Sequence, residues 1–402
     1  MNRRAVFFLF LLIFSSGVLF AEVFRFKYQK DEKYRIVTTV NEEVYINEQF
    51  NNKADFLNKI SVSVLDTKNG AGNIAAHYQV SSRTYGLNID SYTMEEEADS
   101  VFWQNSLGYH TVDKKYLYPL MRNLPVFPEK DIKPAESWTA TGNEVHDLMQ
   151  HYGIPEPYII PVTAEYTYLG NTDKNGKKIA QFKIQYSFFS KVNVKIPKGV
   201  EFYPVQIAGK VVMIYNWDIQ NGKPDSYNDE FHILYLLSTG DTVEFVGKSQ
   251  GNVFLSQTLD REKTKQDIVK ELEKEKVEDV KVEQVEEGVK LTLDNIQFEP
   301  DSDNLLQSEM QKLNKISEIL KKYPDRDIKI VGHAAKRGTE AGQLALSLSR
   351  AKAVANYLLK IGARTPDKMT TVGKGATEPV ADNNTEEGRI KNRRVEIILL
   401  EN

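Results

Sequence analysis

Residues 331–335 read Val-Gly-His-Ala-Ala, and residues 343–351 read Gln-Leu-Ala-Leu-Ser-Leu-Ser-Arg-Ala. The first segment closes a short apolar run, which predicts a buried strand over residues 327–331. From the second segment onward, side chains recur at steps of three and four, the spacing of one buried helix face. They are Leu344, Ser347, Ala351, Val354, Leu358 and Ile361. This stretch therefore predicts a strand followed by a helix over residues 343–361.

Arg350 lies beside the predicted buried face of this helix, three residues after Ser347 and four before Val354. A long side chain in that position can lie along a groove next to the core. The planar guanidinium of arginine can donate two parallel hydrogen bonds to one carboxylate. The sequence therefore indicates Arg350 as a carboxylate-binding residue.

The rest of the last third alternates strands with helices. Apolar runs predict further strands over residues 289–293, 369–372 and 395–400, and a second helical stripe covers residues 306–320. Asp301, Ser302 and Asp303 precede that stripe and offer it an N-cap. The pattern predicts a compact α/β sandwich with a mixed sheet and its helices on one face.

This segment, residues 285–402, resembles the OmpA-like C-terminal domain, a module that anchors bacterial envelope proteins to peptidoglycan. The resemblance is carried by the helix around Arg350, by Gly332-His333, by Phe298, by the Gly-Lys-Gly run at residues 373–375, and by Asn-Arg-Arg-Val-Glu at residues 392–396. It implies a βαβαβ type of fold with a mixed sheet. It also implies a groove for the peptide stem of peptidoglycan.

The resemblance assigns roles to two positions that stand fifteen residues apart. In the family, an Asp binds the ammonium group of a diamino acid in the stem peptide, and an Arg binds its carboxylate. Here Arg350 keeps the Arg position, whereas Ala335 stands where the Asp is usual. Loss of one charge-assisted hydrogen bond costs about 1.5–3 kcal/mol. The resemblance therefore implies a binding site of which one half is missing.

Three further positions complete the implied groove. Gln343 stands where the family usually has Asn, and Asn392 and Arg394 are expected to frame the peptide. For Arg394, a structural pairing with Glu396 is the alternative. His333 is expected to pack against the groove rather than to act as a base.

Two functions are compatible with these residues. The first is a non-enzymatic cell-envelope protein whose C-terminal domain tethers it to peptidoglycan stem peptide, with binding weakened by Ala335. The alternative is a structural or protein-interaction role, in which this domain keeps its fold but no longer binds peptidoglycan. We expect no enzymatic activity, no catalytic residues and no cofactor.

Residues 22–257 have a different character and resemble no family that we can identify. Aromatic and β-branched residues alternate with polar ones between Gly and Asn turns, which predicts an antiparallel, sandwich- or barrel-like region of one or two subdomains. We call it the β region and expect it to bind other envelope proteins or to act as a scaffold. Its predicted strands lie near residues 23–28, 34–40, 44–47, 60–64, 74–80, 84–92, 166–168, 179–189, 211–217, 231–237 and 242–246.

Metal and catalytic sites are not indicated in the β region. His146 and His151 are five residues apart in a predicted helical piece over residues 144–151, which is not the spacing of a shared metal face. We expect both histidines at the surface. The run Glu95-Glu96-Glu97 lacks the alternating spacing of calcium ligands and is expected to be a solvated turn.

Two further segments are the N-terminus, which bears on export, and the stretch that connects the β region to the C-terminal domain. Residues 1–21 combine two Arg, an uncharged apolar run and a small residue, which predicts a secretory signal peptide; an uncleaved anchor is the alternative. Residues 258–284 are rich in charge and predict a helical linker. We therefore expect an exported protein that is periplasmic or associated with the outer membrane.

Composition sets limits on the partners. The chain has 402 residues, a formal net charge of −4 and no cysteine. The charge gives no indication of nucleic-acid binding. The absence of cysteine excludes disulfides, thiolate metal sites and a lipid-acceptor cysteine.

Overall fold

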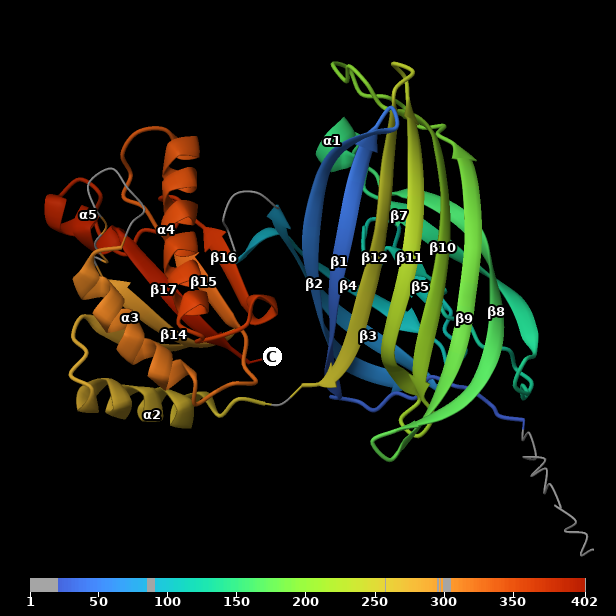
Figure 1. The fold of residues 1–402 in the computed structure, drawn as a ribbon, viewed down its shortest axis with the longest axis horizontal. Coiled ribbons are helices and arrows are strands. Elements are labelled where there is room, and N and C mark those ends of the chain that lie inside the picture. The colour runs from blue at the N-terminus through green and yellow to red at the C-terminus, as the bar shows by residue number, and fades with distance from the viewer. Residues whose placement is uncertain are drawn as a thin grey trace, which may run out of the picture.

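The computed structural model of the chain describes residues 21–84, 91–256, 258–294, 296, 298 and 305–401. It consists of the β region and an α/β part that begins at residue 258 (Figure 1). The all-β region followed by an α/β part with a mixed sheet confirms the predicted fold class. The predicted signal peptide, except for Ala21, lies outside the described residues, as does the predicted N-cap at residues 301–303.

The β region is built from antiparallel strands that follow one another along a strongly curved sheet (Figure 1). Neighbouring strands pair in the order β5-β4-β3-β2-β1-β12-β11-β10-β9-β8-β7-β6, so β5 and β6 are the two end strands of this order. The strands are β1 (Lys33–Ile46), β2 (Gln49–Lys68), β3 (Ala71–Thr84), β4 (Tyr92–Gln104), β5 (His110–Val112), β6 (Met121–Arg122), β7 (Ser137–His146), β8 (Tyr158–Lys174), β9 (Lys177–Lys191), β10 (Pro204–Asp218), β11 (Lys223–Leu237) and β12 (Thr242–Leu255).

Two-residue turns set the register of the hairpins. Asn175 and Gly176 connect β8 to β9 with φ angles of 54° and 77°, and Asn69 and Gly70 connect β2 to β3 with 51° and 76°. Positive φ at both positions is typical of a type I′ turn, which Asn-Gly favours because both residues tolerate this conformation. These turns confirm the prediction that Gly and Asn turns separate strands of the β region.

The N-terminal segment fills the interior of the curved sheet instead of forming the predicted strand over residues 23–28. Phe24 packs edge-on against Phe182 with 4.9 Å between ring centroids, and Phe26 packs against Trp217 at 4.7 Å. The rings of Phe24 and Trp217 are each 1% exposed. The apolar alternation of this segment therefore reflects burial in a core and not strand pairing.

Three predictions for the β region need correction. The run Glu95-Glu96-Glu97 lies within β4 and not in a turn. His146 is buried at the end of β7, where its Nδ1 lies 2.8 Å from the hydroxyl oxygen of Tyr235, so it is not a surface histidine. The predicted helical piece is shorter and later than expected, because α1 spans Met149–Tyr152. The strand predicted over residues 84–92 falls largely outside the described residues.

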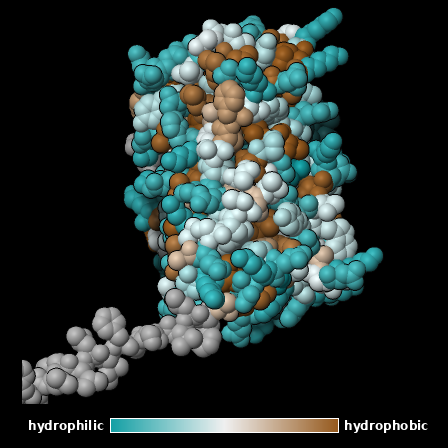
Figure 2. All heavy atoms as spheres, turned by 90° about the vertical axis from the view of Figure 1, so that its right-hand side faces the viewer, coloured by the Kyte–Doolittle hydropathy of each residue, from teal (hydrophilic) through white to brown (hydrophobic). Residues whose placement is uncertain are grey.

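The outer face of the β region over β8 and β9 is mixed in character. Figure 2 shows hydrophobic side chains scattered between hydrophilic ones on this face. Leu169 of β8 and Phe189 of β9 are among the large apolar residues that stay exposed. The alternation of β strands thus places most apolar side chains in the interior and leaves isolated ones outside.

The α/β part has a five-stranded mixed sheet with the order β13-β14-β17-β15-β16. Only β15 and β16 are parallel within it. Its elements are α2 (Arg261–Lys274), β13 (Val280–Val285), β14 (Gly288–Asp294), α3 (Gln307–Leu320), β15 (Ile328–Gly332), α4 (Glu340–Lys360), a 3₁₀ turn (Pro366–Lys368), β16 (Met369–Gly373), α5 (Glu386–Asn392) and β17 (Arg394–Leu400). Among the described residues, no helix is both long and apolar enough to cross a bilayer.

Burial in this part corrects two details of the prediction. The helix α2, predicted as part of a charged linker, buries Ile268 and Leu272 in the same core as β14 and α3. On α4, Gln343 is buried whereas Leu344 is 50% exposed, so the buried face begins one residue earlier than predicted. Leu344 faces outward because the loop after β16 covers the other side of this turn.

The two parts meet along one edge of the α/β sheet. Strand β16 pairs in parallel with β4 through Thr370 opposite Tyr92 and Thr371 opposite Thr93. The Oγ1 of Thr371 also donates to the carbonyl oxygen of Tyr92 at 3.0 Å. Next to this edge, Asp327 accepts from Lys59 of β2, as described below.

Candidate functional site

The candidate groove lies where two loops meet the first turns of α4. One loop, residues 333–339, follows β15, and the other, residues 374–385, follows β16. A Cβ added at Gly332 would lie 2.0 Å from the carbonyl oxygen of Ser347, and one at Gly373 would lie 2.7 Å from Cβ of Leu348. The two glycines therefore let the ends of both strands approach α4 more closely than any other residue would permit.

Backbone hydrogen bonds join the two loops to each other and to α4. The N–H of Ala334 donates to the carbonyl oxygen of Gly375 at 2.7 Å, and the N–H of Gly375 donates to Oγ of Ser347 at 2.9 Å. Ala335 follows directly and is 9% exposed. At the position where the resemblance implies an Asp, the chain thus presents a mostly buried methyl group, which cannot bind an ammonium ion.

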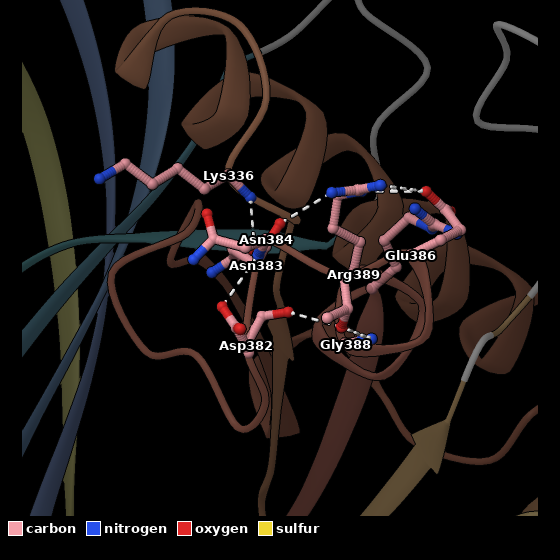
Figure 3. Close-up of polar contacts among 9 residues, drawn as sticks. Lys336, Asp382, Asn383, Asn384, Glu386, Gly388 and Arg389 are labelled. Carbon is pink, nitrogen blue, oxygen red and sulfur yellow. Dashed lines mark hydrogen bonds and ion pairs between the residues drawn. The ribbon is translucent and has the colours of Figure 1, made fainter.

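A polar cluster connects the loop after β15 to the start of α5 (Figure 3). The N–H of Lys336 donates to Oδ1 of Asn383 at 2.9 Å, and Nη1 of Arg389 donates to the carbonyl oxygen of Asn383 at 2.9 Å. Arg389 also pairs with Glu386 at 2.7 Å. Thr385 caps α5 by accepting from the N–H of Gly388 at 3.0 Å.

Sequence reasoning missed this cluster. A signal was present, because Asp-Asn-Asn-Thr at residues 382–385 is a run of turn and N-cap residues directly before a short helix. The cluster holds the loop before α5 in place, so it orients the groove without being part of the binding residues that were predicted.

Arg350 is half-buried on α4 and has an unused hydrogen-bond donor. Its Nε is buried without a hydrogen-bond partner, and its Cζ lies 5.1 Å from the centroid of the Phe298 ring. In the part of the chain that the structure describes, no carboxylate forms an ion pair with Arg350. Burial lowers the pKa of the Arg350 guanidinium, and the nearby charge of Arg393 lowers this pKa further. An anion bound here would supply the missing partner.

Gln343 and Asn392 bond to their own chain. The Nε2 of Gln343 donates to the carbonyl oxygen of Gly338 at 3.2 Å, which holds the loop after β15. The Oδ1 of Asn392 accepts from the N–H groups of Val380 at 2.8 Å and Ala381 at 3.0 Å. Both residues therefore shape the walls of the candidate groove from buried positions.

Arg394 belongs to a buried charge network beneath the groove. Its Nε donates to Oε1 of Glu396 at 2.9 Å, and its Nη2 donates to the carbonyl oxygen of Glu378 at 3.2 Å. Nε2 of His333 lies 3.5 Å from Oε2 of Glu396. Arg394, His333 and Glu396 are 4%, 1% and 6% exposed, so the alternative interpretation of Arg394 as a structural partner of Glu396 describes its observed contacts.

The other candidate positions are not part of this site. His146 lies in the interior of the β region, and His151 is an exposed residue of α1. Within the described ranges, no group of three or more His, Asp or Glu side chains is arranged to hold a metal ion.

The comparisons with known proteins concern the α/β part. Residues 297–393 match the model of the OmpA family. The chain is 41% identical over 104 residues to the peptidoglycan-binding protein ArfA of Mycobacterium tuberculosis. The aligned segment covers 26% of this chain and 32% of ArfA. It is 35% identical over 112 residues to outer membrane porin F of Pseudomonas fluorescens, covering 28% of this chain and 34% of that protein.

A solved structure of an outer membrane protein from Borrelia burgdorferi B31 is 35% identical, and the match covers 30% of this chain and 96% of that chain with a TM-score of 0.26. The match spans about a third of the length of the curated relatives named above. The similarity therefore concerns one domain. Residues 297–393 of this chain form a domain of the OmpA family.

Proposed function

We propose that this chain is a non-enzymatic, exported cell-envelope protein whose OmpA-family domain binds a carboxylate of peptidoglycan stem peptide through Arg350. The observation that carries the proposal is the buried, unpartnered Nε of Arg350 at the edge of the candidate groove. A carboxylate can accept from the guanidinium in a bidentate manner, which restores the hydrogen bond that burial leaves unmade. The similarity to a peptidoglycan-binding protein, ArfA, supports this choice of ligand.

The affinity should be modest because the chain supplies a cation for the carboxylate of the ligand but no anion for its ammonium group. Ala335 offers no carboxylate, and its neighbours Lys336 and Arg337 carry positive charge. The β region, which lies outside the match to the OmpA family, would then serve as a scaffold or bind other envelope proteins.

A structural or protein-interaction role is the second candidate. Three residues favour this role because their polar atoms bond within the chain instead of being free for a ligand. Gln343 bonds to Gly338, Asn392 to residues 380–381 and Arg394 to Glu396. In this role the domain keeps the family's fold, while Arg350 has no ligand.

Sedimentation of the full chain with purified sacculi separates the two candidates. We expect retention of the wild type and at least tenfold weaker retention of Arg350→Ala, since about 1.4 kcal/mol corresponds to a factor of ten. Lys360→Ala is the matched control, because it removes an exposed cation from the other end of α4. Equal retention of Arg350→Ala and Lys360→Ala, or no retention of the wild type, would contradict the proposal.

A further inference from the structure

The charges around Arg350 decide which carboxylates the candidate groove can accept. Glu378, in the loop after β16, and Glu386, in α5, are both occupied by cations of the same chain. Glu386 pairs with Arg389 at 2.7 Å and with Arg393 at 3.2 Å, and Glu378 pairs with Lys374 at 3.1 Å. The described residues therefore leave Arg350 as a positive group whose balancing charge must come from a ligand.

An ammonium group on the ligand finds no corresponding partner. The residue at position 335 is an alanine, and its side chain cannot accept a hydrogen bond. Lys336 and Arg337 are exposed directly after it, and like charges at this range repel. The backbone N–H of Lys336 is already bonded to Asn383, so the loop that carries these two cations is fixed at this point (Figure 3). A free amine next to the bound carboxylate is therefore disfavoured.

We propose that the groove selects a carboxylate whose neighbouring nitrogen is part of an amide, so that the ligand brings a negative charge to Arg350 and no ammonium to Ala335. This inference rests on the proposed function and narrows its ligand. The Phe298 ring lies 5.1 Å from Cζ of Arg350 and supports the guanidinium that would hold the carboxylate.

Two parts of peptidoglycan have this chemistry. One is a diamino acid whose side-chain amine has been acylated by a cross-link, and the other is the C-terminal residue of a stem peptide. A site that requires the free ammonium loses its ligand when a cross-link forms, because the amine becomes an amide. The site in this chain keeps its ligand, so a cross-link would not weaken attachment of the protein to the wall.

Titration of the full chain with four synthetic stem peptides tests this selection. All four have a blocked N-terminus and isoglutamine in the second position, so they differ only at the ends of interest. The first carries diaminopimelate with a free side-chain amine and an amidated main-chain terminus. The second is the same peptide with that amine acetylated. The third has acetyl-lysine followed by a free C-terminal alanine, and the fourth has acetyl-lysine and no carboxylate.

We expect the wild type to bind the second peptide, with the acetylated amine, at least as tightly as the first, with the free amine. We expect it to bind the fourth peptide, which has no carboxylate, at least tenfold more weakly than whichever of the second and third peptides binds more tightly. Tighter binding of the third than of the second identifies the C-terminal carboxylate as the source. Arg350→Ala should lose at least tenfold in affinity for the peptide that the wild type prefers, while Lys360→Ala should not change it. Ala335→Asp should reverse the preference in favour of the free amine.

A wild-type preference of about tenfold or more for the free amine would overturn the inference. Binding of the fourth peptide as tightly as the others would do so as well, because no carboxylate would then be recognised. Retention on sacculi that is lost in Arg350→Ala, without binding of any of the four peptides, also overturns the inference and leaves the proposed function standing. Failure to bind both the peptides and the sacculi overturns the proposed function itself.

Discussion

Glu396 is the acceptor of the buried charge network beneath the groove. It accepts from Arg394 at 2.9 Å and lies 3.6 Å from Nζ of Lys290 and 3.5 Å from Nε2 of His333. Burial raises the pKa of the Glu396 carboxyl. The nearby His333, together with the hydrogen bond and charge of Arg394, more than offsets this effect and lowers the pKa to about 2.

This lowered pKa makes a prediction about stability. A carboxyl whose pKa is lower in the folded state stabilises the fold above its usual pKa of 4.5, and this contribution is lost as the pH falls toward about 2. The Glu396→Gln variant lacks the group and leaves Arg394 without its charge partner. We expect it to be less stable than the wild type by about 3 kcal/mol near neutral pH.

Urea unfolding of both proteins at several pH values checks this prediction. The difference between wild type and Glu396→Gln should be largest near neutral pH and should shrink between pH 4.5 and about 2. Glu340→Gln is the control, because Glu340 is exposed in the first turn of α4. A difference that stays constant over this interval would show that Glu396 does not hold its charge in the way described.

At the scale of single elements, the N-terminus of α4 positions the loop after β15. Thr339 is the N-cap of α4, and its Oγ1 accepts from the N–H of Gly342 at 3.1 Å. Gln343, one turn later, donates to the carbonyl oxygen of Gly338 at 3.2 Å. The cap and this bond together connect the helix start to the loop that carries Ala335.

Replacement of the cap should therefore weaken the domain measurably. We expect Thr339→Ala to lower the free energy of unfolding by about 1 kcal/mol, because one N–H at the helix start loses its acceptor. Thr339→Ser keeps the hydroxyl and should retain most of the stability. Thermal unfolding of the two variants provides the measurement, and equal melting temperatures for Thr339→Ala and the wild type would show that the cap contributes nothing.

The elements of the α/β part could be predicted because their signals are local. Apolar spacing within a few residues placed α3, α4, β14 and β15 close to their observed bounds. The same local signals did not predict which side chains are buried where burial depends on contacts between segments that are far apart in the sequence. Leu344 fits the helical stripe, but the loop around Gly375 approaches α4 so closely that Gln343 is buried instead. The apolar face of α2 was masked by its many charges, although Ile268 and Leu272 belong to the core.

The binding residues show the same division. The resemblance assigned roles to Arg350 and Ala335 from register alone, and these roles remain predictions. It could not show that Arg394 is 4% exposed and bonded to Glu396, since burial depends on how β17 packs beneath both loops. Asn383 could not be identified as a partner of Lys336 either, because the two residues are separated by 47 positions.

At the scale of the whole molecule, an ion triad joins the β region to the OmpA-family domain. Asp327, at the start of β15, accepts from Nη1 of Arg35 at 2.7 Å and from Nζ of Lys59 at 2.6 Å. Asp327 is 1% exposed and Lys59 is 4% exposed. Burial raises the pKa of the Asp327 carboxyl, but the charges of Lys59 and Arg35 more than offset it, so the pKa is lowered. These residues are more than 260 positions apart, and no sequence pattern predicted the junction.

Removal of the Asp327 charge should separate the two parts. We expect Asp327→Asn to cost about 3–5 kcal/mol, because Lys59 then stays buried without a charge partner. The connection around residues 256–260 should become more sensitive to protease, since the pairing of β16 with β4 is short. Asp325→Asn provides a control at a neighbouring acid in the same loop. Equal proteolysis of Asp327→Asn and the wild type would mean that the triad does not hold the parts together.

We propose that Arg350 holds a stem-peptide carboxylate, whereas Ala335 provides no partner for an ammonium group of the ligand. Titration of the free-amine stem peptide into wild type, Ala335→Asp and Arg350→Ala tests it most directly. A restored carboxylate should tighten binding by about 1–2 kcal/mol, or roughly five- to thirtyfold, and Arg350→Ala should bind weakest. Wild type binding this peptide as tightly as Ala335→Asp would contradict the claim, and so would an Arg350→Ala variant that binds as tightly as the wild type.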